Sequence, residues 1–350
     1  MLPKILLVSD TADFALTDVY YGYERAMTAL GIEHSSFPFH HFRNFHKRSV
    51  CLQMLHSEAL MKKNGYTHVM FIGDLNIPLG LLESFHGVKT IVVATEDPHS
   101  FDPMREKLGS IDLYLTNERA VETWAVAQGL TDVAYCPTAA DPLACGYVPR
   151  ETLDAKYLSD IVFLGALYPN RQKMLEGLIP LVRKKGWDLK VLGHPHYVPR
   201  SSPIWDYVPK ENFNAEGSIR TIPHEESVKY YNGAKVSLNF MRDTSWSPAE
   251  CGATNTLNGL GLIAESLNPR AYEVPLCGPV QILEASRAEA REVFTEAEVG
   301  FFTDKKTLRS EVSRLLGTPD GLVRMRLLAA RKVLGAHTYT HRMQSILARM

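Results

Sequence analysis

The sequence predicts an α/β fold of two doubly wound, Rossmann-like domains whose parallel sheets face each other across a cleft. Short apolar runs rich in Val and Ile alternate with helix-period segments along the chain, which is typical of parallel sheets with crossover helices. The alternation lapses over residues 138–156, in a stretch that holds Asp141-Pro142, Gly146 and Pro149, and then restarts. A length of 350 residues also exceeds the usual size of one hydrophobic core.

The first domain is expected over residues 1–150. Each expected strand is a short apolar run, and each expected helix carries apolar residues at helical spacing. The strands are Lys4 to Val8, Glu33 to Phe37, His68 to Ile72, Thr90 to Ala94, Leu113 to Thr116 and Val133 to Cys136. The helices include Asp18 to Leu30 and Glu118 to Gln128. Ligands of open parallel sheets bind beyond the carboxyl ends of the strands, so residues that directly follow a strand are the first candidates for a site.

The second domain is expected over residues 151–335. Its strands are Asp160 to Leu164, Leu189 to Leu192 and Lys235 to Phe240, and its helices are Gln172 to Lys185 and Glu225 to Gly233. Residues 336–350 are expected to form a C-terminal helix, with a return onto the first domain left open. The polar, Gly-rich segment 241–261 lacks clear periodicity. We interpret it as a mobile loop over the cleft, with a surface loop of no function as the alternative.

Composition excludes several classes of protein. The 38 basic and 39 acidic side chains give a net charge of -1, which argues against whole-surface attraction to nucleic acid or to an anionic membrane. The five cysteines form no Cys-x-x-Cys pair, so neither a disulfide framework nor a zinc site is indicated. No signal peptide and no apolar stretch of about 20 residues is present. We therefore expect a cytoplasmic protein with no membrane partner.

Residues 265–278 place charged groups around the start of a helix. Asn268 and the proline after it form a typical helix opening, with Asn as the N-cap, so backbone N–H groups would point outward toward a phosphate. Glu265, Arg270 and Glu273 lie around this opening. An ionised carboxylate on a packed helix is costly unless an arginine or a sugar hydroxyl pairs with it. The segment therefore has the character of a ligand site.

One signature and several shorter segments carry a family resemblance. Arg270 to Gly278 matches the pattern Arg-x-aromatic-Glu-x-x-x-Cys/Ala-Gly. The other segments, in matching order, are Phe163 to Gly165, Tyr168 to Arg171, Tyr230 to Lys235, Leu238 to Asn239 and His337 to Arg342, and in the first half Glu96 to Pro98, Thr116 to Arg119 and Pro137 to Pro142. In these respects the chain resembles the GT-B glycosyltransferases, and more narrowly their CgeB-like branch.

The resemblance implies a nucleotide-sugar donor bound mainly by the second domain, an acceptor bound mainly by the first, and transfer in the cleft. It also implies catalysis without a bound metal, and the sequence contains no Asp-x-Asp triplet. No resident cofactor is expected. The nucleotide sugar, preferably of the UDP type, is a co-substrate.

The donor contacts that the resemblance implies concentrate in the second domain. Arg171 resembles the phosphate-contacting arginine, with a surface ion pair as the alternative. Arg270 either meets the same phosphates or neutralises Glu265 or Glu273. Glu273 is expected to bind the ribose hydroxyls, while Glu265 either meets the transferred sugar or caps a helix. The further donor candidates are His194, Pro223, Asn239 and Asn268.

The first domain should supply the acceptor site and, in an inverting enzyme, a general base. Asp97 and His99 follow the strand Thr90 to Ala94 and are the candidates for that base, with an Asp-Pro turn and a helix cap by Asp97 as the alternative. Asp10 and Asp13 follow the first strand and are candidates for acceptor binding. No glycine appears until Gly22, which departs from the glycine-rich loop of many GT-B proteins.

A basic and aromatic segment lies within the first domain. Residues 34–65 carry five basic side chains against one acidic side chain, Glu58, with four phenylalanines and five histidines between them. Basic residues among aromatic ones suit a nucleic-acid strand, which makes Lys47 and Arg48 candidate acceptor-binding residues. The alternative is an amphipathic loop and helix whose phenylalanines belong to the core.

The sequence therefore predicts a metal-independent glycosyltransferase that moves a sugar from a nucleotide donor to an acceptor hydroxyl. Since CgeB-like proteins also occur in phages, one alternative is transfer to a hydroxymethylated base in DNA. Two further alternatives are a nucleotide-sugar epimerase and a nucleotide-sugar-binding protein without turnover. The sugar, the nucleobase, the acceptor and the stereochemistry are left open.

Overall fold

The chain divides into two compact units, each formed by segments that are distant in sequence. The computed structural model describes residues 3–9, 17–73, 77–193, 198–213, 220, 222–243 and 257–350. The first unit consists of Met1–Thr138, Ala253–Ser266 and Tyr339–Met350, and the second of Ala139–Gly252 and Leu267–Thr338. The division falls at residue 138, ahead of the expected boundary at 150, and the first unit takes in two later segments.

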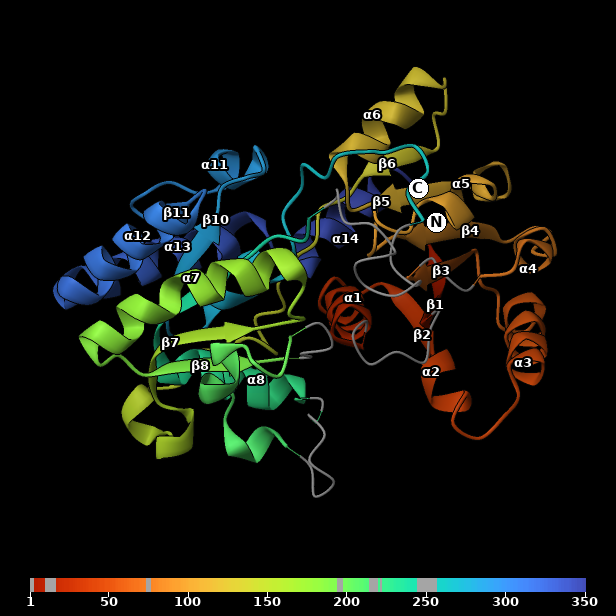
Figure 1. Ribbon diagram of the computed structural model, residues 1–350. Helices are drawn as coiled ribbons and strands as arrows, with labels where there is room; N and C mark the ends of the chain where they lie inside the picture. Colours follow the sequence, from red (N-terminus) through yellow and green to blue (C-terminus); the bar gives the residue numbers. More distant parts are fainter. Residues whose placement is uncertain are drawn as a thin grey trace. The chain divides into compact units, whose positions relative to one another are not determined.

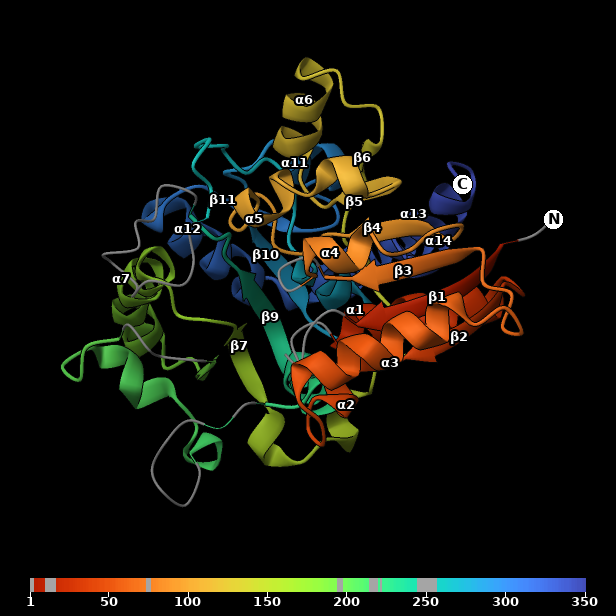
Figure 2. The same ribbon diagram turned by 90° about the vertical axis from the view of Figure 1, so that its right-hand side faces the viewer.

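The described part of the first unit contains a six-stranded parallel sheet with the strand order β2-β1-β3-β4-β5-β6 (Figures 1 and 2). The strands are β1 (Lys4–Ser9), β2 (Glu33–Phe37), β3 (His68–Ile72), β4 (Lys89–Val93), β5 (Leu113–Thr116) and β6 (Val133–Tyr135). The helices are α1 (Thr17–Ala29), α2 (Phe39–Phe42), α3 (Arg48–Leu60), α4 (Leu79–Leu82), α5 (Asp102–Arg105), α6 (Arg119–Ala127) and α14 (Tyr339–Leu347). Figure 2 shows α3 running along the sheet near β1 and β2.

Helix α14 packs against α1 within the first unit. A Cβ on Gly22 would collide with the Tyr339 ring, so only glycine allows this close approach. The rings of Tyr23 and Tyr339 lie 5.0 Å apart, and the Arg342 guanidinium donates to the Pro137 carbonyl at 2.9 Å. Residues from the last part of the chain thus complete the packing of the first helix.

The described part of the second unit contains a five-stranded parallel sheet with the order β11-β10-β9-β7-β8 (Figure 1). The strands are β7 (Ser159–Leu164), β8 (Leu189–Leu192), β9 (Ala234–Asn239), β10 (Val280–Glu284) and β11 (Gly300–Phe302). The helices are α7 (Pro169–Lys185), α8 (His224–Gly233), α10 (Arg270–Glu273), α11 (Glu289–Val293), α12 (Lys305–Gly317) and α13 (Leu322–Ala336). One apolar cluster lies between this sheet and helices α7 and α12.

Both units have the predicted α/β class with parallel strands, so the prediction of fold class is confirmed. Every strand in both sheets is largely buried except β2, whose first four residues are partly or fully exposed, as expected for an edge strand. Among the residues that the structure describes, no helix has the length and hydropathy needed to cross a membrane.

Candidate functional site

Three arginines gather beyond the carboxyl ends of the strands in the second unit. Arg171 lies in the first turn of α7 and is only 4% exposed. Its Nη1 donates to the Ala166 carbonyl at 3.0 Å, and its guanidinium lies 4.9 Å from the centre of the Tyr168 ring. Arg242, which follows β9, lies over the same ring at 5.3 Å. The ring thus orients two guanidinium groups that would otherwise repel each other.

The charge of this arginine cluster is only partly compensated. Burial, then the positive charges of Arg270 and Arg242, lower the pKa of Arg171 to about 9, while Tyr168 and Glu284 oppose the shift. The Glu284 carboxylate also accepts the Met241 N–H at 2.7 Å, and burial raises its pKa. Arg270 forms no ion pair with any residue in the described ranges. A bound anion would remove the repulsion among the three cations.

Two glycines leave the ends of β7 and β8 bare beside this cluster. Gly165 and Gly193 have φ values of 148° and 140°, which favour glycine. A Cβ on Gly165 would lie 2.8 Å from Nη2 of Arg270, and a Cβ on Gly193 would collide with the backbone of Gly165. The absence of a side chain at Gly165 therefore lets the Arg270 guanidinium pack against the backbone that follows β7, and glycine at position 193 lets the ends of β7 and β8 lie close together.

A buried amide network fixes the segment that carries Arg270. Asn239 at the end of β9 donates to Asn268 Oδ1 at 3.0 Å and to Gln281 Oε1 at 2.8 Å, and its own Oδ1 accepts from Asn268 at 2.8 Å. Gln281 then donates to the Ala271 carbonyl at 3.1 Å. Because Asn239 is 1% exposed and its amide is fully used, the structure gives it the part of a positioning residue.

The helix that follows Asn268 is much shorter than a typical helix dipole site requires. Asn268 Oδ1 does accept the Ala271 N–H at 3.2 Å, as expected of a cap. However, α10 has four residues and continues only as a 3₁₀ turn, Val274–Leu276. The expectation that a helix end supplies the positive charge is therefore corrected, since a single turn has few aligned peptide dipoles. The arginine side chains supply that charge.

Glu273 is the last residue of α10, and Pro223, another donor candidate, directly precedes α8. His224, which follows Pro223 and begins α8, has Nε2 3.6 Å from the Cys145 thiol. A hydrogen bond with Cys277, then burial, raise the pKa of Cys145, and the charge of Glu273 adds to the shift. His224 therefore contacts the Cys145 thiol, and the charge of Glu273, which is distant in sequence, acts on the same thiol.

Tyr231 is influenced both by Glu273 and by Arg270 of the arginine cluster. Burial raises the pKa of its hydroxyl, while the charge of Arg270 lowers it and that of Glu273 raises it further. The hydroxyl is buried and has no hydrogen-bond partner among the described residues. Sequence reasoning missed Tyr231, Cys145 and Arg242. Only Arg242 had a usable signal, since it directly follows a strand.

Glu265 belongs to the first unit rather than to the donor segment. The Glu118 carboxylate accepts the backbone N–H of Glu265 at 2.8 Å and that of Ser266 at 3.2 Å. The side chain of Glu265 is exposed and caps no described helix. Three other predicted site residues, His194, Asp10 and Asp13, lie outside the described residues.

Asp97 is the best defined of the first-unit candidates. It accepts hydrogen bonds from Thr116 Oγ1 at 2.6 Å and from the Tyr114 hydroxyl at 3.0 Å. Burial raises its pKa to about 7 against the effect of these bonds, and the charges of Glu118 and Glu96 raise it further. Its partners lie on β5, and α5 begins only at Asp102, so Asp97 does not cap that helix.

Asp97 and His99 are 3% and 6% exposed, so neither is presented to solvent. The His99 carbonyl accepts the Leu257 N–H at 2.9 Å, which ties the segment after residue 256 to the first unit. Tyr114 and Thr116, whose hydroxyl groups donate to Asp97, were not expected to be part of a site. Their alternation on a strand gave no sign of this contact.

The basic and aromatic segment is divided between core and surface. Phe37 and Phe39 are buried in the core, as the structural alternative expected, whereas Phe45 is 82% exposed. Lys47 and Arg48 are exposed at the start of α3. An exposed aromatic ring therefore lies next to exposed cations in the sequence.

The chain has two α/β units, each with a sheet of parallel strands, and arginines line the strand edge in one of them. The class of protein with these features is the GT-B glycosyltransferases. Within this class, the chain belongs to the family described as glycosyl transferase-like, whose model matches residues 171–348. The resemblance inferred from the sequence is thereby confirmed.

Individual relatives agree with this assignment. The chain is 24% identical to the spore protein CgeB of Bacillus subtilis (strain 168) over 261 residues, which cover 71% of this chain and 73% of that protein. Sucrose-phosphate synthase from Thermosynechococcus elongatus is similar in structure, with a TM-score of 0.60 and 15% identity over 99% of this chain and 98% of the other. HepE from Anabaena, solved in complex with UDP-glucose, has a TM-score of 0.52 and 10% identity over 99% and 98%.

Proposed function

We propose that this glycosyltransferase moves a sugar from a nucleoside diphosphate donor, of the UDP type, to an acceptor hydroxyl, without a metal ion on the diphosphate. The observation that carries the proposal is the cluster of Arg171, Arg242 and Arg270 beside the bare glycine ends of β7 and β8. Guanidinium groups in a partly buried site stabilise the charge that develops on a leaving diphosphate. UDP-glucose in the structurally similar HepE supports the choice of donor.

The proposed reaction breaks the bond between the anomeric carbon and the β-phosphate oxygen and forms a bond from that carbon to the acceptor oxygen. The acceptor proton goes to a base, for which Asp97 and His99 are the candidates. Arg171 and Arg270 hold the departing diphosphate, and Glu273 accepts hydrogen bonds from the ribose hydroxyls. We place the reaction in the cytoplasm, where the free thiols of Cys51, Cys136, Cys145 and Cys277 stay reduced.

Titration calorimetry with UDP, followed by a UDP-release assay with an acceptor panel, tests this proposal. We expect UDP to bind, Glu273→Gln to weaken it about tenfold through loss of charged hydrogen bonds, and Arg171→Ala and Glu273→Ala to abolish release. Glu311→Gln, on α12 beside Arg314, is the matched control and should bind UDP normally.

Three outcomes would contradict the proposal. If Glu273→Gln bound UDP as tightly as the wild type, the proposed contact between Glu273 and the ribose would be wrong. Conversion of the donor without an acceptor would identify an epimerase. Donor binding without release under any acceptor would identify a binding protein.

A hydroxymethylated base in DNA is a second candidate for the acceptor, and exposed Phe45 beside Lys47 and Arg48 favours it. A ring and two cations can stack on a base and neutralise phosphates. This version predicts DNA binding that weakens with salt and with a Lys47→Ala, Arg48→Ala double variant. An absence of binding at low salt would exclude it.

A further inference from the structure

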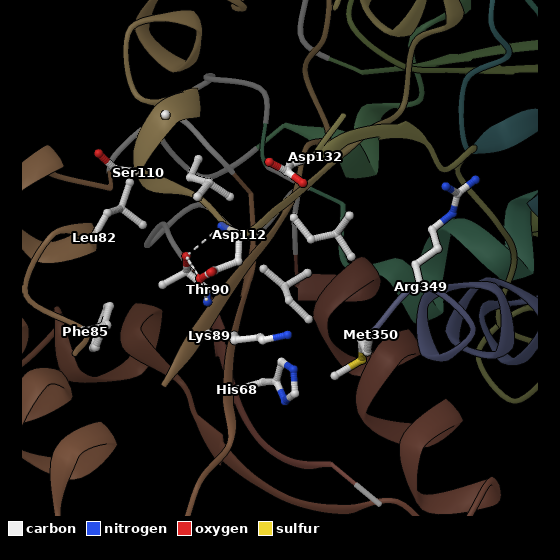
Figure 3. Close-up of a pocket in the computed structure, with 14 residues that line it drawn as sticks. His68, Leu82, Phe85, Lys89, Thr90, Ser110, Asp112, Asp132, Arg349 and Met350 are labelled. Atoms are coloured by element: carbon white, nitrogen blue, oxygen red, sulfur yellow. Dashed lines mark hydrogen bonds between the residues drawn. The ribbon is translucent and has the colours of Figure 1, made fainter. Parts of the chain in front are cut away.

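A separate pocket lies at the opposite edge of the first unit's sheet, where the strands begin. Its volume is about 560 Å³ (Figure 3). It is lined by the first residue of β3, the first residues of β4, and residues directly before β5 and β6. The polar lining residues are His68, Lys89, Thr90, Ser110, Asp112, Asp132 and Arg349. The sites of GT-B proteins use the carboxyl edge of each sheet, so this pocket is not part of the donor or acceptor machinery.

The hydrogen bonds around His68 fix its tautomer. Thr67 Oγ1 lies 3.1 Å from the Lys4 carbonyl, which can only accept, so the single hydroxyl hydrogen points there. The same oxygen lies 2.8 Å from His68 Nδ1, which must therefore donate. Burial, then the charge of nearby Lys89, lower the pKa of His68, so the ring is neutral near pH 7. Its Nε2 is consequently an acceptor.

No described residue donates to that acceptor. His68 is 9% exposed, and its Nε2 is buried without a hydrogen-bond partner. Figure 3 shows the flexible Lys89 side chain beside the ring, at the side of the pocket. A buried acceptor without a donor is unfavourable, so the site favours a ligand that brings an O–H or N–H group.

The other lining side chains include both hydrogen-bond acceptors and donors, and acidic and basic side chains are equal in number. Asp112 Oδ2 is held by the Thr90 N–H at 2.7 Å and by Thr90 Oγ1 at 3.0 Å, which fixes the carboxylate at the wall of the pocket. Asp132 makes no side-chain hydrogen bond to a described residue and is exposed. Lys89 and Arg349 balance these two acids. Leu82 and Phe85 add an apolar wall.

We propose that this pocket is a second binding site, for a neutral, hydroxyl-rich molecule of monosaccharide to disaccharide size. A hydroxyl both donates and accepts, so it can satisfy His68 Nε2 and the carboxylates while accepting from Lys89. The balanced charge of the lining disfavours a strongly charged ligand, and the apolar wall suits the C–H face of a sugar ring. The volume lies within the range of about 300 to 1,000 Å³ that small-molecule sites occupy.

Ligand-observed NMR and the ¹⁵N shift of His68 Nε2 test the proposal on the full chain. The neutral probes are D-glucose, N-acetyl-D-glucosamine and maltose, and the charged probes are glucosamine and glucose 6-phosphate. We expect at least one neutral probe to bind and to shift the His68 Nε2 signal, with UDP present or absent. His68→Phe should weaken binding at least tenfold, because it keeps the ring and removes the acceptor.

Two further variants keep the test decisive. His34→Phe makes the same change on β2, outside the pocket, and should bind the neutral probe normally. Asp132→Asn changes an exposed residue and should weaken binding even if His68→Phe does not fold. The proposal is overturned if no neutral probe binds, if only a charged probe binds, or if His68→Phe and Asp132→Asn both bind like the wild type.

Discussion

The two units differ in the charged groups that lie at the carboxyl ends of their strands. In the second unit, Arg171, Arg242 and Arg270 gather with incomplete compensation. In the first unit, the buried carboxylates of Asp97 and Glu118 are surrounded by hydroxyl and backbone N–H donors of the protein itself. Cations that lower one another's pKa favour the binding of an anion, whereas the donors around a buried carboxylate stabilise the fold that holds it. The second unit is therefore the part of the chain in which we propose that the anionic donor binds.

Arg270→Met should have the largest effect on this contrast. Loss of a charged hydrogen bond to the diphosphate should weaken UDP binding by about 10- to 100-fold. The melting temperature should not fall, because removal of Arg270 also removes its repulsion of Arg171. Calorimetry and thermal melts measure both quantities.

The control for this variant is Arg183→Met, which removes an exposed arginine of α7 that pairs with Asp206 at 2.8 Å. It should leave UDP affinity unchanged. If Arg270→Met bound UDP as tightly as Arg183→Met, the interpretation of the cluster as an anion site would be wrong.

Asp97→Asn tests the satisfied carboxylate through the pH dependence of stability. Because the folded-state pKa of Asp97, about 7, exceeds the ordinary value of 3.8, the folded protein binds this proton more tightly than the unfolded chain. The resulting contribution to stability is present below pH 3.8 and is lost as the pH rises to about 7.

Asp97→Asn should abolish this loss, which amounts to roughly 1 to 4 kcal/mol in the free energy of unfolding. Urea unfolding of both proteins at pH 5 and pH 8 measures it. Parallel pH profiles for the two proteins would show that Asp97 is already ionised at pH 5.

Glu118→Gln should have the smallest effect. The carboxylate holds the N–H groups of Glu265 and Ser266, and glutamine keeps one acceptor oxygen, so we expect a loss of about 1 kcal/mol. Amide exchange at these two positions should be faster by about fivefold. In the second unit, Glu289→Gln should instead speed exchange at Leu267, whose N–H it accepts at 2.6 Å. If both variants changed exchange equally at all three amides, the interpretation that Glu118 and Glu289 hold different residues would be wrong.

Much of the fold could be predicted because buried parallel strands are short apolar runs. Strands β2, β3, β5 and β8 occupy the expected residues. Strands β1, β6 and β7 differ by one residue at one end, and β4 and β9 are displaced by one residue at both ends. Strands β10 and β11 were not expected: β10 directly follows Gly278 and Pro279, and β11 has only three residues and begins with a glycine. Helix α3 was expected only within the alternative for residues 34–65, an amphipathic loop and helix, and its buried residues are Cys51, Leu55 and Ala59.

The site was less predictable, because its chemistry depends on tertiary contacts. Arg171 was implied by the family resemblance, and Arg270 was found from its place at a helix start and from the same resemblance. The role of Asn239 in an amide network, and the anchoring of Glu265 by Glu118, depend on partners more than 25 residues away. Tyr231 lies in the segment Tyr230 to Lys235, which carries part of the family resemblance, but the sequence assigned it no role, and only the opposing effects of Arg270 and Glu273 on its pKa draw attention to it.

The packing of Tyr339 into the space above Gly22 has a consequence for the order in which the protein forms. Chains emerge from the ribosome with the N-terminus first, and domains usually fold as they appear. Here α1 emerges before the second unit, but its partner α14 follows the last segment of that unit. The second unit can therefore finish folding before the first one does. The unit whose synthesis begins first is therefore the one whose packing is completed last.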